Sequence, residues 1–228
     1  MPDVESAAAI VLAAGESRRM GQDKTLLTVL GRPLIAYALD AFQACPLVDQ
    51  VVVVLSPDNA EMVLPLLAAF PKVVRTCMGG RRRQDSVRAG LHTIAPREWV
   101  VVHDGARPLV TPALIAAGVE AAQATGAAAA ALPLVETLKE ADVLGVVRRT
   151  VPRSDLWTVQ TPQVFRHDLL LRAHNAAIVD VTDDCALVEQ IGGRVKLYPG
   201  DRANVKVTTP EDLPIVEALL RERNRQGR

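Results

Sequence analysis

The most informative stretch of the chain is Ile10-Val-Leu-Ala-Ala-Gly-Glu-Ser-Arg-Arg-Met-Gly-Gln-Asp-Lys-Thr25. It begins as an apolar strand, and the small residues 13–15 that end this strand let a ligand approach the backbone. The cations Arg19 and Lys24 follow soon afterwards. In an open α/β sheet, ligands bind beyond the carboxyl ends of the strands. A loop there with exposed amides and cations predicts a polyphosphate site.

This loop has neither of the two standard phosphate-binding patterns. A P-loop follows G-x-x-x-x-G-K-S/T, but Gly15 and Gly21 are one residue too far apart, and Lys24 does not follow Gly21 directly. The dinucleotide pattern G-x-G-x-x-G is absent as well. The alternative interpretation is a small-residue turn with solvent-exposed arginines. We favour a ligand site because the loop directly follows the end of a buried strand.

Apolar runs alternate with amphipathic segments along the rest of the chain. Strands are expected at 8–12, 51–55, 73–76, 100–102, 127–132, 195–198 and 205–207. Helices are expected at 34–44, 60–69, 85–94, 112–124, 168–178, 184–191 and 210–223. The second strand lacks polar residues, as parallel strands buried on both faces do. The pattern predicts an α/β, Rossmann-like fold, in which helices cover both faces of a mostly parallel twisted sheet.

Two segments need separate interpretation. The alanine-rich run 127–131 has a helical propensity, but Gly126 and Pro133 enclose it closely, which favours a strand. Segment 136–152 is charged and β-branched around Gly145, which predicts a projecting β-hairpin arm. The chain has no Ser/Gly-rich linker and no internal repeat, so residues 1–228 are expected to form a single domain that carries this arm.

The composition excludes several classes of protein. Lys+Arg and Asp+Glu both number 26. Non-specific electrostatic binding to nucleic acid or anionic lipid needs an excess of basic residues. Aromatic residues make up 3% of the chain, too few for stacking on single-stranded nucleic acid. The three cysteines form no metal-binding or disulfide pattern, and the apolar stretch 7–14 is too short for a membrane span. We therefore expect a cytoplasmic protein without nucleic-acid or membrane partners.

Three polar residues stand where a ligand site is expected. Asp104 follows the apolar run 99–102, where a carboxylate can hold Mg²⁺ against phosphates; a turn-forming or helix-capping Asp is the alternative. Arg107 is near enough to reach a substrate phosphate, and a structural ion pair is its alternative. Ser86 falls in the first turn of a predicted helix, where the sequence alone favours capping of backbone donors.

Other polar residues are expected to have structural roles. The arginines at 81–83 are expected to form a solvent-exposed face, although one of them could contact phosphate. His103 follows an apolar strand and is expected to be buried rather than to act as a base. The four His residues fit neither a catalytic triad nor a zinc site.

Residues 10–25 resemble the phosphate loop of sugar-nucleotidyltransferase-like enzymes, which transfer a nucleoside monophosphate from a triphosphate. Within that superfamily, Met20-Gly-Gln-Asp-Lys-Thr-Leu-Leu27 with Gly31-Arg-Pro33 is most similar to molybdenum-cofactor nucleotidyltransferases. A molybdenum-cofactor or pentitol-phosphate nucleotidyltransferase is therefore one alternative function. A non-catalytic nucleotide-binding domain is another.

Further segments resemble the 2-C-methyl-D-erythritol 4-phosphate cytidylyltransferase family of isoprenoid precursor synthesis. They are Gly79-Gly-Arg-Arg-Arg-Gln-Asp-Ser-Val87, Val102-His-Asp-Gly-Ala-Arg-Pro108, Leu156-Trp-Thr-Val-Gln-Thr-Pro-Gln163, Thr182-Asp-Asp184 and Asn204-Val-Lys-Val-Thr208. With the loop, the resemblance extends in order along most of the chain. A degraded, non-catalytic domain would not be expected to retain Arg19, Lys24, Asp104 and Lys206 together.

This resemblance implies transfer of CMP from CTP to a sugar-alcohol phosphate, 2-C-methyl-D-erythritol 4-phosphate, with Mg²⁺ as cofactor. The implied catalytic residues are Arg19, Lys24, Arg153 and Lys206. The implied nucleotide site consists of Ala13, Ala14, Gly15, Gly80, Ser86 and Asp104, and Asp104 also holds the metal ion. The implied substrate site consists of Arg107, Thr137, Arg153, Thr161, Thr182 and Lys206.

The resemblance also implies a homodimer joined by the arm 136–152, in which Arg153 reaches the neighbouring subunit's substrate. The acceptor phosphate is a dianion and already a nucleophile at neutral pH, so no general base is required. Four positions depart from the family's pattern: Leu12, Ser17, Asp23 and Arg81. These departures bear on the conformation of the loop and on its nucleotide preference.

Overall fold

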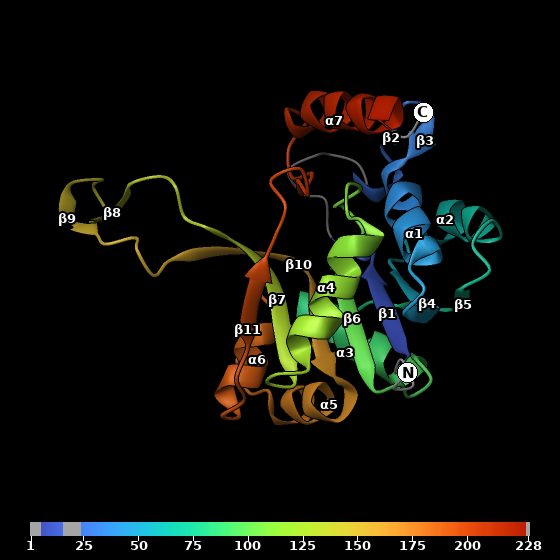
Figure 1. The fold of residues 1–228 in the computed structure, drawn as a ribbon, viewed down its shortest axis with the longest axis horizontal. Helices are drawn as coiled ribbons and strands as arrows, with labels where there is room; N and C mark the ends of the chain where they lie inside the picture. Colours follow the sequence, from blue (N-terminus) through green and yellow to red (C-terminus); the bar gives the residue numbers. More distant parts are fainter. Residues whose placement is uncertain (1–5, 16–23, 227–228) are drawn as a thin grey trace.

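The central element is a seven-stranded sheet, seen in a computed structural model that describes residues 6–15 and 24–226 (Figure 1). Its strands lie in the order β11 (Lys196–Pro199), β7 (Ala127–Pro133), β10 (Trp157–Arg166), β6 (Trp99–Asp104), β1 (Ala7–Leu12), β4 (Val48–Leu55) and β5 (Val73–Met78). β10 runs antiparallel to its neighbours β6 and β7, and the other neighbouring strands pair in parallel. The prediction of a mostly parallel sheet is confirmed.

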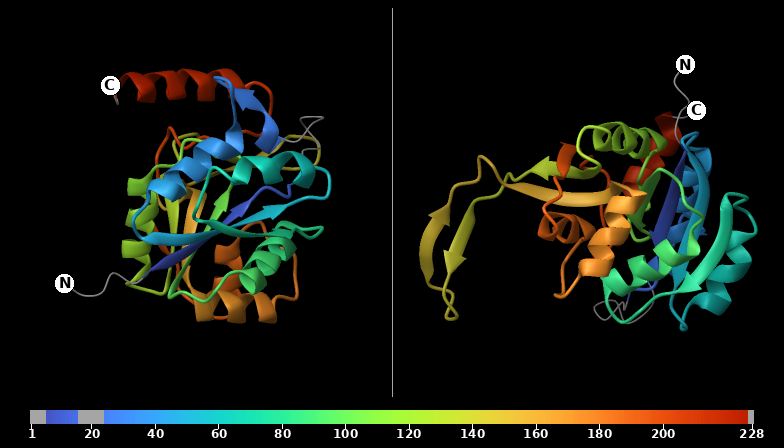
Figure 2. Two further views of the ribbon diagram at one scale, coloured as in Figure 1. Left: turned by 90° about the vertical axis from the view of Figure 1, so that its right-hand side faces the viewer. Right: turned by 90° about the horizontal axis from the view of Figure 1, so that it is seen from below.

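Helices cover both faces of the sheet (Figure 2). One face carries α1 (Leu34–Ala44), α2 (Ala60–Leu67) and α4 (Pro112–Ala122), and the other carries α3 (Arg83–Thr93), α5 (His167–Ala176) and α6 (Asp184–Gln190). In β1, Val11 packs with the first group of helices and Ile10 with the second. Because side chains alternate along a strand, burial on both faces requires the unbroken apolar runs seen in the sequence.

A third, smaller core lies above the carboxyl ends of the parallel strands. There α7 (Asp212–Gln226) packs near a hairpin of β2 (Thr28–Val29) and β3 (Arg32–Pro33), which follows the short helix η1 (Lys24–Leu26) (Figure 1). The buried residues of this core are Val29, Leu34, Leu109, Val207, Val216 and Leu220. Within residues 6–15 and 24–226, no helix combines the length and apolarity needed to cross a membrane.

A separate two-stranded hairpin projects far from the sheet (Figures 1 and 2). It consists of β8 (Leu138–Ala141) and β9 (Val147–Val151), which pair antiparallel. Its tip is apolar and in contact with solvent, since Val143 is 100% exposed and Leu144 is 85% exposed. The predicted projecting arm is confirmed, and apolar residues gathered at such a tip are typical of an interaction surface.

Several elements differ from the sequence-based expectation, and the short hairpin of β2 and β3 is one that the sequence does not predict. The sequence does not predict β10, because Pro162 and the polar residues around it interrupt the apolar pattern. The prediction of a strand at 205–207 is wrong, because this segment is a loop that Val207 N anchors to Ala106 O at 2.9 Å. Its valines pack into the third core rather than into a sheet.

Candidate active site

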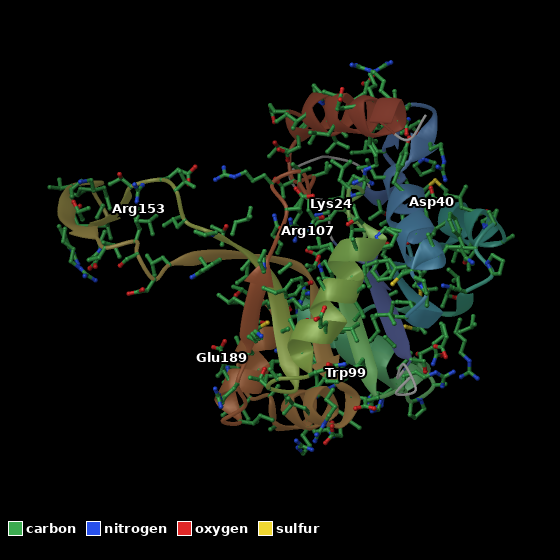
Figure 3. The ribbon with its side chains drawn as sticks, viewed as in Figure 1. Lys24, Asp40, Trp99, Arg107, Arg153 and Glu189 are labelled. Atoms are coloured by element: carbon green, nitrogen blue, oxygen red, sulfur yellow. The ribbon has the colours of Figure 1, made fainter. Side chains whose placement is uncertain are left out.

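A cleft with two chambers opens at the carboxyl ends of β1 and β6. The first chamber, of about 270 Å³, is lined by the end of β1, by Lys24 and by the start of α3. The second chamber, of about 200 Å³, is lined by Arg107, by β10 and by the loop before α6. Arg83, Asp104 and Lys206 line both chambers. Figure 3 labels Lys24, which lines the first chamber, and Arg107, which lines the second.

Ala14 and Gly15, which follow β1, form one wall of the first chamber, and Ala13 just before them is held in place by hydrogen bonds behind that wall. Ala13 N donates to Val54 O at 2.8 Å, and Asn59 Nδ2 donates to Ala13 O at 2.7 Å. Across the chamber, Gly80 N donates to the buried hydroxyl of Ser86 at 3.2 Å. Ser86 therefore supports the turn before α3, as the sequence alone suggests, and it also lines the chamber.

Asp104 lies at the end of β6, where the two chambers meet. Its Oδ2 is 2.6 Å from Lys206 Nζ, and its Oδ1 is 3.5 Å from Arg83 Nε. Burial alone raises the pKa of Asp104, but the charges of Arg83 and Lys206 outweigh burial and hold that pKa well below its usual range. The carboxyl group is therefore ionised at neutral pH.

Arg83 corrects the expectation that the three arginines at 81–83 are solvent-exposed. Its Nη1 lies 2.6 Å from Asp184 Oδ2, and Asp184 Oδ1 accepts from His174 Nε2 at 2.9 Å. Burial alone lowers the pKa of Arg83, but Asp184 and Asp104 raise it well above its ordinary value. Among the described residues, its buried Nη2 has no hydrogen-bond partner.

This ion pair could not be predicted from the sequence, because its partners are far apart along the chain. Arg83 and Asp184 are separated by 101 positions, and they meet because α3 and α6 cover the same face of the sheet. One signal could have suggested the pair. Segment 79–87 contains three consecutive arginines, segment 182–184 contains two adjacent aspartates, and both segments resemble the same family.

His103 is fully buried beside Asp104. Its Nε2 lies 3.2 Å from Arg107 O, which can only accept, so Nε2 carries the proton and Nδ1 accepts from Thr161 Oγ1 at 3.2 Å. Burial lowers the pKa of His103 to about 4, so the ring is neutral at neutral pH. Thr161 Oγ1 also accepts from Asp104 N at 3.1 Å and so holds the end of β6 in place.

Lys206 is positioned by polar side chains that hold the loop before it. Gln160 Nε2, on β10, donates to Asp201 O at 2.9 Å. Arg107 Nη1 donates to Asn204 O at 2.8 Å. Arg107 therefore supports the loop of Lys206 and also lines the second chamber.

Thr182 and Asp183 line the second chamber from the loop before α6. Asp183 caps α6 by accepting from Ala186 N at 3.1 Å, and its other oxygen accepts from Gln163 Nε2 at 2.9 Å. The second chamber thus brings together four of the predicted substrate residues: Arg107, Thr161, Thr182 and Lys206.

Four predicted site residues are not seen in the lining of this cleft. Ala13 is buried, and both of its backbone polar groups are bonded to other parts of the chain. Thr137 and Arg153 are exposed at the base of the arm, where Arg153 Nη1 donates to Val135 O. Figure 3 shows Arg153 out along the arm, far from Arg107. Arg19 lies outside the described residues. Within one chain, therefore, Thr137 and Arg153 do not reach the cleft.

The side chains at the junction of the chambers fit a divalent cation. Mg²⁺ takes one or two carboxylates and completes its shell with phosphate oxygens and water. Asp104 is ionised and lines both chambers, as such a ligand must. In the described part of the chain, no group of three or more His, Cys, Asp or Glu side chains could hold a metal. Substrate oxygens and water would therefore complete the coordination shell.

Comparisons of the sequence with known proteins agree on one family. The family model described as 2-C-methyl-D-erythritol 4-phosphate cytidylyltransferase (IspD) matches residues 7–222. A 2-C-methyl-D-erythritol 4-phosphate cytidylyltransferase from Dehalococcoides mccartyi is 45% identical over 221 residues, covering 96% of this chain and 97% of the relative.

Solved structures agree with the sequence comparison. The 4-diphosphocytidyl-2C-methyl-D-erythritol synthase from Anaerococcus prevotii has a TM-score of 0.85 at 28% identity, covering 96% of this chain and 97% of its own. The 2-C-methyl-D-erythritol 4-phosphate cytidylyltransferase from Thermus thermophilus has a TM-score of 0.75 at 35% identity, covering 93% of this chain and 98% of its own.

Proposed function

The chain belongs to the 2-C-methyl-D-erythritol 4-phosphate cytidylyltransferase family, and from this premise we propose how its two chambers share one reaction. It is a nucleotidyltransferase that transfers CMP from CTP to 2-C-methyl-D-erythritol 4-phosphate in isoprenoid biosynthesis. The products are 4-diphosphocytidyl-2-C-methyl-D-erythritol and pyrophosphate. A match over nearly the whole chain favours this function over the molybdenum-cofactor and pentitol-phosphate alternatives, which rest on the first loop alone.

The first chamber binds CTP and the second binds the methylerythritol phosphate. The observation that carries this division is that Arg83, Asp104 and Lys206 line both chambers. The nucleotide lies along the backbone of Ala14 and Gly15 and against Gly80 and Ser86. Lys24, with Arg19 from the same loop, neutralises the triphosphate.

In the reaction, an oxygen of the acceptor phosphate attacks the α-phosphorus of CTP. The new P–O bond forms as the bond to the β-phosphate breaks, and pyrophosphate leaves with that electron pair. Arg107, Thr161 and Thr182 orient the acceptor, while Lys206 neutralises charge at the reacting phosphates. No residue has to remove a proton from the attacking dianion, which agrees with a buried, neutral His103.

Asp104 is the residue that would hold Mg²⁺ at the junction of the chambers. When bound there, the ion supplies positive charge to the phosphate oxygens of CTP. The chain's own part is to keep Asp104 ionised and fixed, through Arg83 on the carboxylate and Thr161 on the backbone.

The arm completes the acceptor site in a homodimer. Its exposed apolar tip needs a covering surface, and a two-fold pair would cover both tips by the same contact. Thr137 and Arg153 lie at the base of the arm, beyond the reach of their own cleft, and in the dimer they contact the partner's acceptor. Because both substrates are charged and water-soluble, we expect the enzyme to act in an aqueous compartment, the cytoplasm.

A matrix of nucleotides and acceptors tests this function directly. Pyrophosphate release is measured with CTP or GTP against methylerythritol phosphate and a pentitol phosphate, with and without Mg²⁺. We expect rapid release only with CTP, methylerythritol phosphate and Mg²⁺ together. Faster release with GTP or with the pentitol phosphate would contradict the assignment, and no release with any pair would favour the non-catalytic alternative.

A further inference from the structure

Gln84 is a buried residue of α3 that has no part in the proposed chemistry. Its Nε2 donates to Val179 O at 3.2 Å, and its Oε1 accepts from Val181 N at 3.0 Å. These two backbone groups flank Asp180, so the amide pairs with the chain as a parallel neighbouring strand would. Gln84 is 6% exposed, and its two bonds are therefore largely shielded from water.

The segment that Gln84 holds leads directly into the second chamber. Thr182 and Asp183 follow Val181 and line that chamber. Beyond them the chain is fixed, because Asp183 caps α6 and Asp184 binds Arg83. Any movement of Thr182 must therefore come from the part of the loop that precedes it.

Packing holds that earlier part only weakly. Ile178 is 92% exposed and Val179 is 48% exposed, although Ala177 and Val181 are partly buried against the core. Among the described residues, the hydrogen bonds that tie segment 177–182 to another element are the two made by Gln84. On the side that precedes Thr182, the hydrogen bonds that hold the loop to another element therefore come from one glutamine side chain.

We propose that Gln84 is a positioning residue for the acceptor, and that it acts by fixing the loop that presents Thr182 to the second chamber. This inference rests on the proposed division of the two chambers between CTP and the acceptor. Gln84 is absent from the lining of both chambers, so its effect must pass through the loop. Its loss should weaken acceptor binding and leave CTP binding unchanged.

The chain offers a matched control in Gln50. This glutamine is 4% exposed, and its amide also brackets backbone, donating to Ala95 O at 2.8 Å and accepting from Ala95 N at 3.3 Å. It lies near the amino end of β4, whereas the cleft lies at the carboxyl ends of the parallel strands. Substituting it should disturb stability much as substituting Gln84 does, without touching the acceptor loop.

The experiment compares Gln84→Met with Gln50→Met, because methionine keeps the length of glutamine and removes both hydrogen bonds. Pyrophosphate release gives KM for each substrate, and hydrogen exchange follows the amide of Val181. We expect Gln84→Met to raise the acceptor KM about tenfold, because it removes the two hydrogen bonds that hold the loop. The KM for CTP should stay within about twofold of wild type. Exchange at Val181 should accelerate in that variant alone.

Several outcomes would overturn the proposal. An unchanged acceptor KM in Gln84→Met would do so, as would an equal rise in Gln50→Met or an equal rise in both KM values. If Gln84→Met does not fold, Gln84→Glu decides, since it keeps the acceptor for Val181 N but loses the donor to Val179 O. Failure of both variants to fold beside a folded Gln50→Met would make Gln84 structural. A wild-type enzyme without activity would instead contradict the proposed function itself.

Discussion

Asp104 is a single carboxylate that faces Lys206, Arg83 and the proposed metal ion. Asp104→Asn keeps the shape of the side chain but removes the charge that attracts Mg²⁺. We expect weak Mg²⁺ binding by calorimetry with CTP present, and loss of turnover that high Mg²⁺ partly restores. Asp40→Asn, in the exposed ion pair with Arg32, is the control and should match wild type. If the Mg²⁺ titration of Asp104→Asn also matches wild type, the carboxylate is structural.

Lys24 is proposed to neutralise the triphosphate from the edge of the first chamber. In Lys24→Ala, the single-turnover rate should fall by roughly 10²–10³, which is typical when one electrostatic donor is removed from an active site. Arg19→Ala should behave likewise. Because Lys24 is only partly buried in the short helix η1, the free energy of unfolding of Lys24→Ala should change by only about 0.5 kcal/mol. Near-normal turnover at saturating substrates would remove the residue from the catalytic group. The control is Lys196→Ala, because Lys196 is an exposed residue of β11.

His103 should make the folded protein sensitive to acid. Burial lowers its pKa from 6.5 to about 4, so between these values the unfolded chain binds a proton that the folded chain does not. Stability is therefore lost as pH falls through this window, up to about 3 kcal/mol from this group. Urea unfolding in EDTA at pH values across the window should show this loss in wild type, and much less of it in His103→Gln. The exposed His92→Gln should retain the wild-type dependence; equal curves for all three proteins would contradict the assignment.

At the scale of elements, the turn between β5 and α3 depends on a close backbone approach. A Cβ at Gly79 would lie 2.3 Å from Ala14 Cβ and 2.7 Å from Ser86 Oγ, so the two walls of the first chamber would have to separate. We expect Gly79→Ala to cost about 1–3 kcal/mol of stability and to raise KM for CTP. Gly90→Ala, which crowds Ile10 at 2.6 Å inside the core, should also destabilise but leave CTP KM unchanged. Equal CTP KM values in the two variants would contradict a role for Gly79 in the chamber.

Elements with a strong local pattern could be predicted from the sequence. The strand at 51–55 and the alanine run of β7 are buried on both faces, and their bounding residues mark their ends. β10 could not be predicted, because its hydrogen bonds are long-range and Pro162 hides its pattern. The valines at 205–207 alternate as in a strand, yet the local pattern cannot show that their partners are helix α7 and β2.

At the scale of the whole molecule, the arm should deliver Arg153 to the partner's site. Mixing an Arg153→Ala chain with a Lys206→Ala chain tests this, since each mixed dimer would contain one intact site and one doubly damaged site. With random pairing, activity should recover to roughly a quarter of wild type in a two-fold dimer with independent sites. If Arg153 instead served the site of its own subunit, every site would carry one of the two substitutions, and mixing would recover no activity. No recovery in a sample with confirmed subunit exchange would exclude a shared site.

The candidate site could be predicted only where its residues sit in local motifs. Asp104, Arg107 and Thr161 line the expected cleft, because a strand end or a motif gives their place. The role of Arg83 and that of Gln84 could not be predicted, since each depends on partners that lie about a hundred positions away in the sequence. Such contacts become visible only when the two helices are seen on the same face of the sheet.

Lys206, which both chambers share, lies far along the chain from the loop at Lys24, and this order matters while the protein is being made. On the ribosome, amino-terminal segments emerge and begin to fold first, at about 5–20 residues per second. The end of β1 and the turn before α3 are therefore translated well before the loop that supplies Lys206. A nascent chain that ends before Lys206 therefore lacks a side chain that lines both chambers. Catalytic activity begins only when translation has passed the loop at 200–206.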